Sequence, residues 1–216
     1  MSTPRAVLWD LDGTLADSRE YHWRSWRDTI APFGITLTDA QFSASFGQRN
    51  DAIIPAWLGD RATPTLIRDI GDAKEALYRE MLAAGGIAPL PGAADWVRQL
   101  HADGWRQAIA SSAPRANVTL MARLLGFTDA MGALIGAEDV QHGKPAPDVF
   151  LAAAAALGVS PDRAVVVEDA AAGIEAARRA GMPCIGVGDN GTDAALVRAH
   201  ALDQLPADTF ARLIPR

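Results

Sequence analysis

The chain contains a single cysteine, no basic run and no long apolar segment, and each absence excludes a class of protein. One thiol, Cys184, cannot build a disulfide framework, so we expect a reducing, cytoplasmic setting and a buried, small apolar role for that side chain. The net charge of −6, with 26 acidic against 20 basic residues, argues against nucleic acid as a partner. The longest alanine-rich apolar stretch, 150–159, is about half a membrane span, so we expect no membrane partner. The first predicted strand follows Met1–Arg5 directly, so we also expect no signal peptide.

Short apolar runs alternate with helical segments over most of the chain. The 216 residues, 49% of them hydrophobic, are enough for one core, and the length fits one domain or one domain with an insertion. Strands are predicted at 6–9, 107–110, 133–136, 164–167 and 184–187. Helices are predicted at 93–101, 115–125, 148–157 and 171–180, each followed by a glycine. This alternation predicts an α/β fold with a Rossmann-like parallel sheet covered by helices on both faces.

Residues 17–87 interrupt the alternation, because they contain no convincing strand. Apolar residues at helical spacing mark two faces, Trp23, Trp26, Ile30 and Phe33 on one helix and Leu66, Ile70, Ala73, Leu77 and Met81 on another. We expect an inserted α-helical cap domain over 17–87, and an α/β core made of 1–16 and 88–216. Such a cap can admit substrate, close and exclude water.

The first predicted strand ends at two carboxylates, Asp10 and Asp12, followed by Gly13 and a threonine. Open α/β sheets bind their ligands at the carboxyl ends of the strands. Two acids at this spacing can share a divalent cation, and Gly13 permits a sharp turn. An acidic turn that caps a helix explains the same segment. An EF-hand loop fits poorly, because the glycine is fourth rather than sixth and Tyr21 holds the twelfth position.

Polar side chains also stand at or between the ends of the later predicted strands. They are Ser111, Ser112, Lys144, Glu168 and Asp169. Together these groups suit a phosphoryl ligand, because carboxylates hold a metal, the metal and the lysine offset phosphate charge, and hydroxyl groups bind its oxygens. Each alone has an ordinary explanation: a solvated loop lysine, a serine that caps a helix, or an acidic pair at a helix N-terminus. Their recurrence at successive strand ends favours one site.

In this order the segments resemble the four motifs of the haloacid dehalogenase superfamily over nearly the whole chain. The motifs are Asp10-Leu-Asp12-Gly-Thr, Ser111 after the second strand, Lys144 in Gly-Lys-Pro-Ala-Pro-Asp, and Glu168-Asp169. The helical insertion resembles the first cap type of that superfamily. The likeness extends to its β-phosphoglucomutase-like branch, on residues Glu20, Tyr21, His22, Trp26, Gly47, Arg49 and Lys74.

The resemblance implies catalysis through an aspartyl phosphate. Asp10 is expected to be the nucleophile and Asp12 the general acid and base. Mg²⁺ is the expected cofactor, held by Asp10, by the main-chain carbonyl of Asp12, and by Asp169 with Glu168 nearby. The phosphate-binding residues implied are Ser111, Ser112 and Lys144. The substrate-binding residues implied are His22, Arg49, Lys74, Arg115 and Asn117.

Two departures from the branch concern the metal and the substrate. Ala170 replaces the serine or threonine that commonly follows the acidic pair, which removes a hydroxyl near the metal. The loop after Ser111 lacks the Ser-Lys-Asn run that binds a second phosphate in the mutases, and Arg115 or Asn117 is the candidate to replace it. Two of the substrate-binding candidates in the cap have alternative explanations. His22 can be a histidine bonded to a neighbouring residue, and Arg49 can be a solvated arginine.

Two enzymatic interpretations remain open beside one from another class. The first is a Mg²⁺-dependent phosphatase of a small phosphorylated metabolite, with a sugar phosphate expected. The second is a β-phosphoglucomutase-like mutase, which returns the phosphoryl group to a different hydroxyl. A non-enzymatic phospho-receiver switch also uses an acceptor aspartate and a lysine, but places that aspartate after a later strand. A dehalogenase has no use for the acid at Asp12. We expect a small phosphorylated substrate as partner, and a monomer or weak dimer.

Overall fold

The structure, a computed structural model, describes residues 3–189 and 191–215. Positions 1, 2, 190 and 216 of the predicted core therefore lie outside the described residues. The chain divides into two compact units, Met1–Asp17 with Ala88–Arg216, and Ser18–Ile87. Each unit contains its own apolar cluster. Over the described residues, no helix has both the length and the apolarity needed to cross a bilayer.

The larger unit is built on a parallel sheet of six strands within the described residues, in the order β3-β2-β1-β4-β5-β6. The strands are β1 (Ala6–Trp9), β2 (Arg106–Ala110), β3 (Ala133–Ile135), β4 (Ala164–Glu168), β5 (Cys184–Val187) and β6 (Val197–Ala199). The register pairs Trp9 with Ile109 of β2 and with Val167 of β4. Asp10 therefore leaves the sheet at the same edge as the residues that follow β2 and β4.

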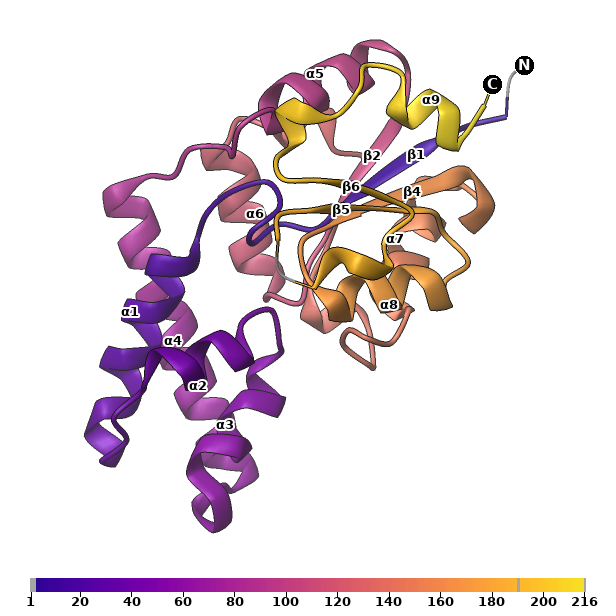
Figure 1. The fold of residues 1–216 in the computed structure, drawn as a ribbon. Coiled ribbons are helices and arrows are strands. Elements are labelled where there is room, and N and C mark those ends of the chain that lie inside the picture. Colours follow the sequence, from indigo (N-terminus) through magenta and orange to yellow (C-terminus); the bar gives the residue numbers. More distant parts are fainter. Residues whose placement is uncertain (1–2, 190, 216) are drawn as a thin grey trace. The chain divides into compact units, whose positions relative to one another are not determined.

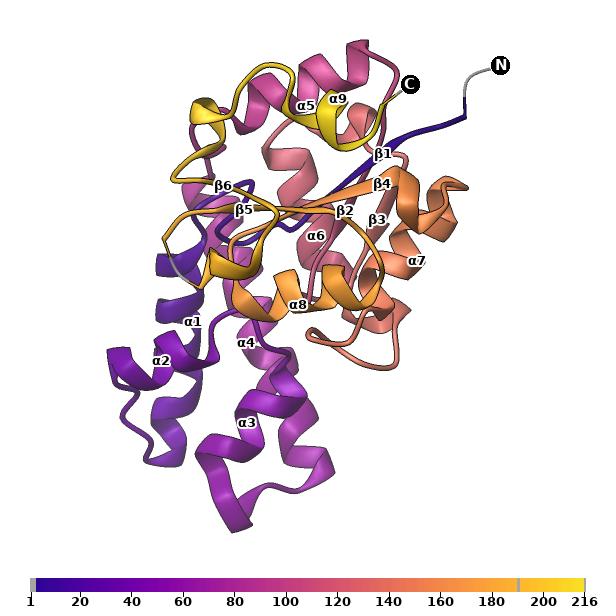
Figure 2. The same ribbon diagram turned by 45° about the vertical axis from the view of Figure 1, so that its right-hand side comes forward.

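Helices cover both faces of this sheet (Figure 1 and Figure 2). They are α5 (Ala93–Ala102), α6 (Arg115–Leu124), α7 (Asp148–Leu157), α8 (Ala171–Arg179) and α9 (Thr209–Leu213). On one face, α7 and α8 share an apolar cluster with alternate residues of the central strands and with Cys184, which is buried as expected. On the other, Phe210 of α9 packs against Trp9 and against Trp96 of α5. The predicted α/β class is confirmed.

Five of the strands lie within one residue of their predicted bounds at each end, whereas β6 was not predicted. The predicted strands are short apolar runs, and β1 and β4 are buried along their whole length, as strands covered on both faces must be. β6 is an edge strand of three residues with the exposed Arg198 at its centre. An edge strand need not be apolar, so its sequence carries no such signal.

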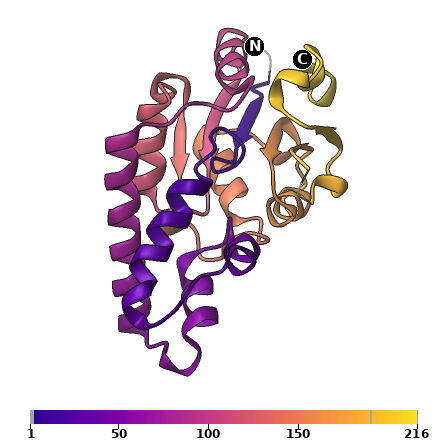
Figure 3. The ribbon, with the colours of Figure 1, turned by 60° about the vertical axis from the view of Figure 1, so that its left-hand side comes forward.

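The smaller unit is entirely helical over its described residues, as predicted. Its helices are α1 (Arg19–Ile30), α2 (Asp39–Ser45), α3 (Asn50–Leu58) and α4 (Pro64–Gly85). Figure 3 shows α1 and α4 running side by side, and their residues are in extensive contact. Trp26 and Ile30 of α1 contribute to the apolar core, whereas Phe33 lies beyond the end of that helix and is only half-buried.

The predicted buried face of α4 is only partly correct, because Ile70 is buried and Leu66 packs against the apolar cluster, but the buried side is rotated away from the other predicted residues. Ala73 is exposed and Leu77 half-buried, and the side that is buried carries Ile70, Gly71, Lys74, Glu75, Tyr78 and Leu82. The prediction ranked faces by apolar residues alone, and that count misses a lysine and a glutamate that are buried because they pair with each other.

Candidate active site

Asp10 stands directly after β1, where its main-chain N–H donates to the carbonyl of Val167 at 2.9 Å. Its side chain is buried, and Asp12 follows half-buried in a tight turn that an Asp12–Ala16 bridge closes. Gly13 makes the turn possible with φ at +94°, a conformation that L side chains rarely adopt. A Cβ on Gly13 would lie 2.2 Å from Oδ2 of Asp169, so the glycine also allows the two segments to approach.

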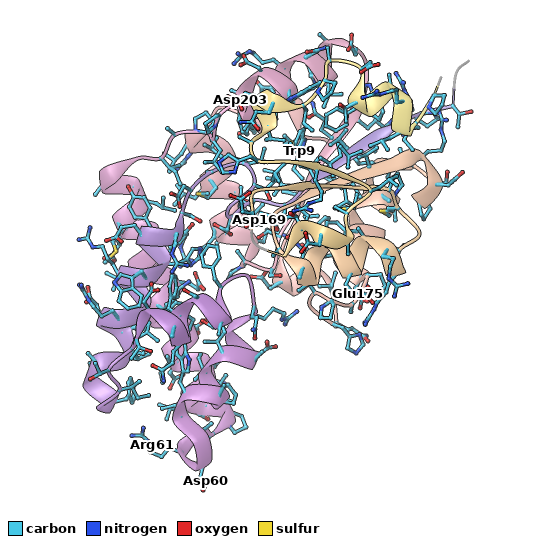
Figure 4. The ribbon with its side chains drawn as sticks, viewed as in Figure 1. Trp9, Asp60, Arg61, Asp169, Glu175 and Asp203 are labelled. Carbon is cyan, nitrogen blue, oxygen red and sulfur yellow. The ribbon has the colours of Figure 1, made fainter. Side chains whose placement is uncertain are left out.

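Three carboxylates from two segments meet at this edge of the sheet. One oxygen from each of Asp10, Glu168 and Asp169 lies within 4.8 Å of the others. Thr14 Oγ1 donates to Asp169 Oδ1 at 3.3 Å, and the main-chain N–H of Ala170 donates to Glu168 Oε1 at 3.2 Å. Figure 4 shows Asp169 close to the strand ends, whereas the half-buried Glu175 lies on the outer side of α8. The predicted metal-binding carboxylates are thus close enough to bind one cation.

Lys144 joins this cluster from the loop that precedes α7. Its Nζ lies 2.5 Å from Asp10 Oδ1 and 2.9 Å from Glu168 Oε2, and the side chain is only 5% exposed. The ammonium also lies 4.9 Å from the centre of the Phe150 ring. The ordinary explanation of a solvated loop lysine is therefore wrong, because Lys144 is a buried cation shared by two carboxylates.

The charges in this cluster do not balance. Burial raises the pKa of Asp10, although the charge of Lys144 opposes the rise, and burial together with the Asp10 charge raises the pKa of Glu168 well above its ordinary value. The same two causes raise the pKa of Asp169 to about 7. Burial lowers the pKa of Lys144, but the charges of Asp10 and Glu168 outweigh it and raise that pKa overall. One ammonium thus faces three carboxylates, and a divalent cation with oxygen ligands fits both the donors and the surplus negative charge.

The predicted phosphate-binding serines follow β2. Ser111 is buried, and its Oγ accepts a hydrogen bond from the main-chain N–H of Ala113 at 3.0 Å. Ser112 is half-buried. Because β2 pairs with β1 in parallel, both serines leave the sheet at the same edge as Asp10.

Of the two candidates for binding a second phosphate in the core, Arg115 is paired with a carboxylate and Asn117 is buried. The Arg115 guanidinium forms an ion pair with Asp139, and its main-chain N–H donates to Glu138 Oε2 at 2.8 Å. Asn117 is 1% exposed within α6. The loop after Ser111, which lacks the Ser-Lys-Asn run of the mutases, therefore carries an arginine, Arg115, whose charge is already neutralised by Asp139.

The three cap candidates also have partners inside their own unit. His22 Nδ1 lies 2.9 Å from Nζ of Lys74, which is 1% exposed. Arg49 is paired with Asp51 at 3.1 Å, and its side chain is 22% exposed. His22 is therefore a histidine bonded to a neighbour, and Arg49 is a partly exposed residue.

Two residues close to the carboxylates were given no role in the sequence analysis. Thr14 belongs to the first motif, and a hydroxyl so close to Asp10 and Asp12 could have been predicted to donate to a carboxylate of the site, as it does to Asp169. Gly173 lies in α8, and a Cβ there would be 2.1 Å from Cδ of Glu168. Nothing in a glycine within a helix indicates such an approach, which only the folded arrangement reveals.

Gly13→Ala tests the close approach to Asp169, with Gly104→Ala as its matched control. Gly104 has a similar φ of +76° but nothing within 4 Å of its Cβ position. Both changes place alanine in the left-handed region and are expected to lower the free energy of unfolding by about 1–2 kcal/mol. Only Gly13→Ala should displace Asp169, so we expect at least roughly tenfold lower turnover in that variant alone. Equal turnover of the two variants, compared at a temperature where both are folded, would contradict this role.

The fold and the site together define the class. Residues 4–181 match the family model for haloacid dehalogenase-like hydrolases, and the chain belongs to this family of enzymes. Membership of an enzyme family argues against the phospho-receiver alternative.

The relatives include a phosphatase and a mutase. The chain is 33% identical to fructose-1-phosphate phosphatase YqaB of Escherichia coli, over 84% of this chain and 95% of the relative. It is 32% identical to β-phosphoglucomutase of Bacillus subtilis, over 85% and 83%. A crystal structure of mutant CbbY from Rhodobacter sphaeroides in complex with xylulose-1,5-bisphosphate superposes with a TM-score of 0.85 at 28% identity, covering 94% of this chain and 96% of that one.

Proposed function

We propose that this enzyme is a Mg²⁺-dependent phosphatase of a small phosphorylated metabolite, most simply a sugar phosphate, acting through an aspartyl phosphate. The observation that carries the proposal is the buried cluster in which Lys144 bridges Asp10 and Glu168. The names of the relatives support the substrate class, because they include a sugar-phosphate phosphatase, a sugar-phosphate mutase and a protein bound to a sugar bisphosphate.

In the proposed reaction, the Asp10 carboxylate attacks the phosphorus atom and the phosphate ester bond breaks. Asp12 gives a proton to the leaving alkoxide, and then takes one from the water that hydrolyses the aspartyl phosphate and releases phosphate. Lys144 holds the Asp10 carboxylate in place, and Ser111 and Ser112 bind the phosphoryl oxygens. Mg²⁺, when bound by Asp10, Glu168, Asp169 and the Asp12 carbonyl, supplies positive charge beside the phosphoryl group.

The core favours hydrolysis over mutase activity. A mutase must hold a bisphosphate intermediate, but Arg115 is paired with Asp139 and Asn117 is buried. The mutase remains the second candidate because the β-phosphoglucomutase relative is nearly as similar as the phosphatase, and because the cap carries the His22–Lys74 pair. We propose that His22, Arg49 and Lys74 contribute substrate contacts from the cap.

A panel of sugar phosphates and nucleoside monophosphates, scored for free phosphate and for isomerised product, tests this function. With Mg²⁺ we expect phosphate release from at least one sugar phosphate and no isomerised product by ³¹P NMR. Removing divalent ions with EDTA should lower the rate at least ~100-fold, because a bound cation supplies several kcal/mol of charge stabilisation, and Mg²⁺ should restore it. Isomerised product without phosphate release would instead favour the mutase, and unchanged rates in EDTA would exclude the metal.

The cellular compartment and the oligomeric state are proposed from the sequence alone. We propose a cytoplasmic enzyme, on the basis of its single cysteine, and a monomer or weak dimer. Sedimentation at micromolar concentration and fractionation of expressing cells address the two proposals.

A further inference from the structure

A chain of buried polar contacts links the cap helices α1, α3 and α4. Lys74 Nζ on α4 lies 2.9 Å from His22 Nδ1 on α1 and 2.9 Å from Oε1 of the adjacent Glu75. Asn50, the first residue of α3, donates from Nδ2 to the same Glu75 oxygen at 2.8 Å. The proposed function gives His22 and Lys74 a part in substrate binding but gives no task to Glu75 or Asn50.

The chemistry of these contacts determines the protonation of His22. An ammonium group carries three donors and no acceptor, so its contact with Nδ1 requires a lone pair on that nitrogen. A neutral imidazole with a lone pair on Nδ1 carries its proton on Nε2. The ring plane is fixed as well, because His22 stacks on Tyr78 at 4.2 Å and meets the edge of Phe46 at 5.8 Å.

Glu75 supplies the charge that this arrangement needs. Lys74 is buried beside the rings of Trp26 and Tyr78, at 5.1 and 5.0 Å from their centres, and an ammonium in such surroundings is stable only when it is paired. Burial raises the pKa of Glu75, but the charge of Lys74, the charge of His22 whenever that ring is protonated, and the hydrogen bonds from Lys74 and Asn50 outweigh it, so that this pKa lies below its ordinary value. Glu75 is therefore an ionised partner at neutral pH.

We propose that Glu75 is a positioning residue which, through Lys74, holds His22 in its Nε2–H tautomer. His22 then offers the substrate an N–H donor rather than a lone pair, and its ligand is a phosphoryl or hydroxyl oxygen. The inference deepens the proposed function and rests on it, because it takes His22 to be a substrate contact.

Glu75→Gln tests the charge while it keeps the size of the side chain and an amide oxygen that accepts hydrogen bonds. Without the Glu75 carboxylate, no negative charge stabilises the buried Lys74 ammonium, so the neutral amine is favoured. A neutral amine can either donate a hydrogen bond to Nδ1 of His22 or accept one from it. In protein labelled with ¹⁵N-histidine, with the His22 signals identified by their loss in His22→Gln, we expect a single Nε2–H tautomer in the wild type at pH 8. Glu75→Gln should convert it to a mixture and raise KM for the sugar phosphate roughly tenfold, with kcat little changed. The exposed Glu80 on the same helix provides the control, and Glu80→Gln should leave both readouts unchanged.

Two outcomes overturn the positioning role. One is an Nδ1–H tautomer or an imidazolium at His22 in the ¹⁵N spectrum of the wild-type protein, a result that can be obtained without any variant. The other is a folded Glu75→Gln protein that keeps the single Nε2–H tautomer. If Glu75→Gln does not fold, Asn50→Ala removes one hydrogen bond from the carboxylate and should shift the tautomer in the same direction. Failure of every sugar phosphate as a substrate would overturn the proposed function, whereas the tautomer measurement is independent of turnover.

Discussion

Asp10→Asn is expected to abolish phosphate release, with a loss of at least ~10³-fold, while the protein stays folded. The amide cannot act as the nucleophile that forms the aspartyl phosphate, and replacing a catalytic nucleophile removes most of the rate enhancement. The fold should survive because a neutral side chain is compatible with a site where burial already disfavours the Asp10 charge. Lys144 also keeps its second partner, Glu168, at 2.9 Å. Steady-state phosphate release and circular dichroism measure the two expectations.

Asp203→Asn provides the matched control, because it makes the same chemical change on the exposed surface of the larger unit (Figure 4). It should leave turnover unchanged. Asp12→Asn gives a different pattern, since a proton-transfer residue contributes about 10²–10⁴-fold and its loss should let phosphoenzyme accumulate in intact-mass spectra. Measurable turnover in Asp10→Asn that exceeds the rate of Asp12→Asn would show that Asp10 is not the nucleophile.

Lys144→Met is expected to damage both stability and activity. The change leaves Asp10, Glu168 and Asp169 without their buried cation, and breaking a buried ion pair in this way costs about 3–5 kcal/mol in the free energy of unfolding. We expect this loss in urea unfolding with EDTA present, together with a fall in turnover of at least ~10²-fold. Added Mg²⁺ should restore part of the stability, because it offsets the same surplus negative charge.

The pH dependence of this loss has a definite sign. Lys144 lowers the pKa values of Asp10 and Glu168, so removing it raises both further in the folded state. The folded variant then binds more protons than the unfolded chain, and its stability falls as pH rises. The deficit relative to wild type should therefore be larger at pH 8 than at pH 5.5.

Arg98→Met is the control for Lys144→Met, because Arg98 forms an ion pair with Asp95 in which both side chains are at least 70% exposed. An exposed pair contributes only about 0–1 kcal/mol, so this variant should be nearly as stable as the wild type at both pH values. A Lys144→Met protein with the same small effect would show that the carboxylates do not depend on the lysine for their charge balance.

The fold could be predicted wherever burial leaves a pattern in the sequence. β1 and β4 are continuous apolar runs, and their burial on both faces explains why they were found. β6 was missed because an edge strand of three residues needs no apolar run. The buried face of α4 was misplaced because it includes Lys74 and Glu75, whose burial depends on their pairing and not on their hydropathy.

The candidate site could be predicted where acids and a lysine recur at strand ends, but its electrostatics could not. The chain order gives Asp10, Lys144 and Asp169, and parallel topology places the segments that carry them at one edge. It does not show that Lys144 is shared between two carboxylates, or that Arg115 is neutralised by Asp139. Such contacts depend on side chains from distant segments, and only the folded structure provides them.

β1 lies at the centre of the sheet, yet its two neighbours in the sheet, β2 and β4, begin only at Arg106 and Ala164. A ribosome that adds about 5–20 residues per second needs roughly 10–30 s to proceed from β1 to β4. During that time the four apolar residues of β1 lack at least one of their two sheet neighbours, whereas the helices of 18–87 form a compact unit within one continuous segment. The unit whose synthesis begins first is thus the last to complete its folding, because its central strand is made first and its later strands only in the second half of the chain.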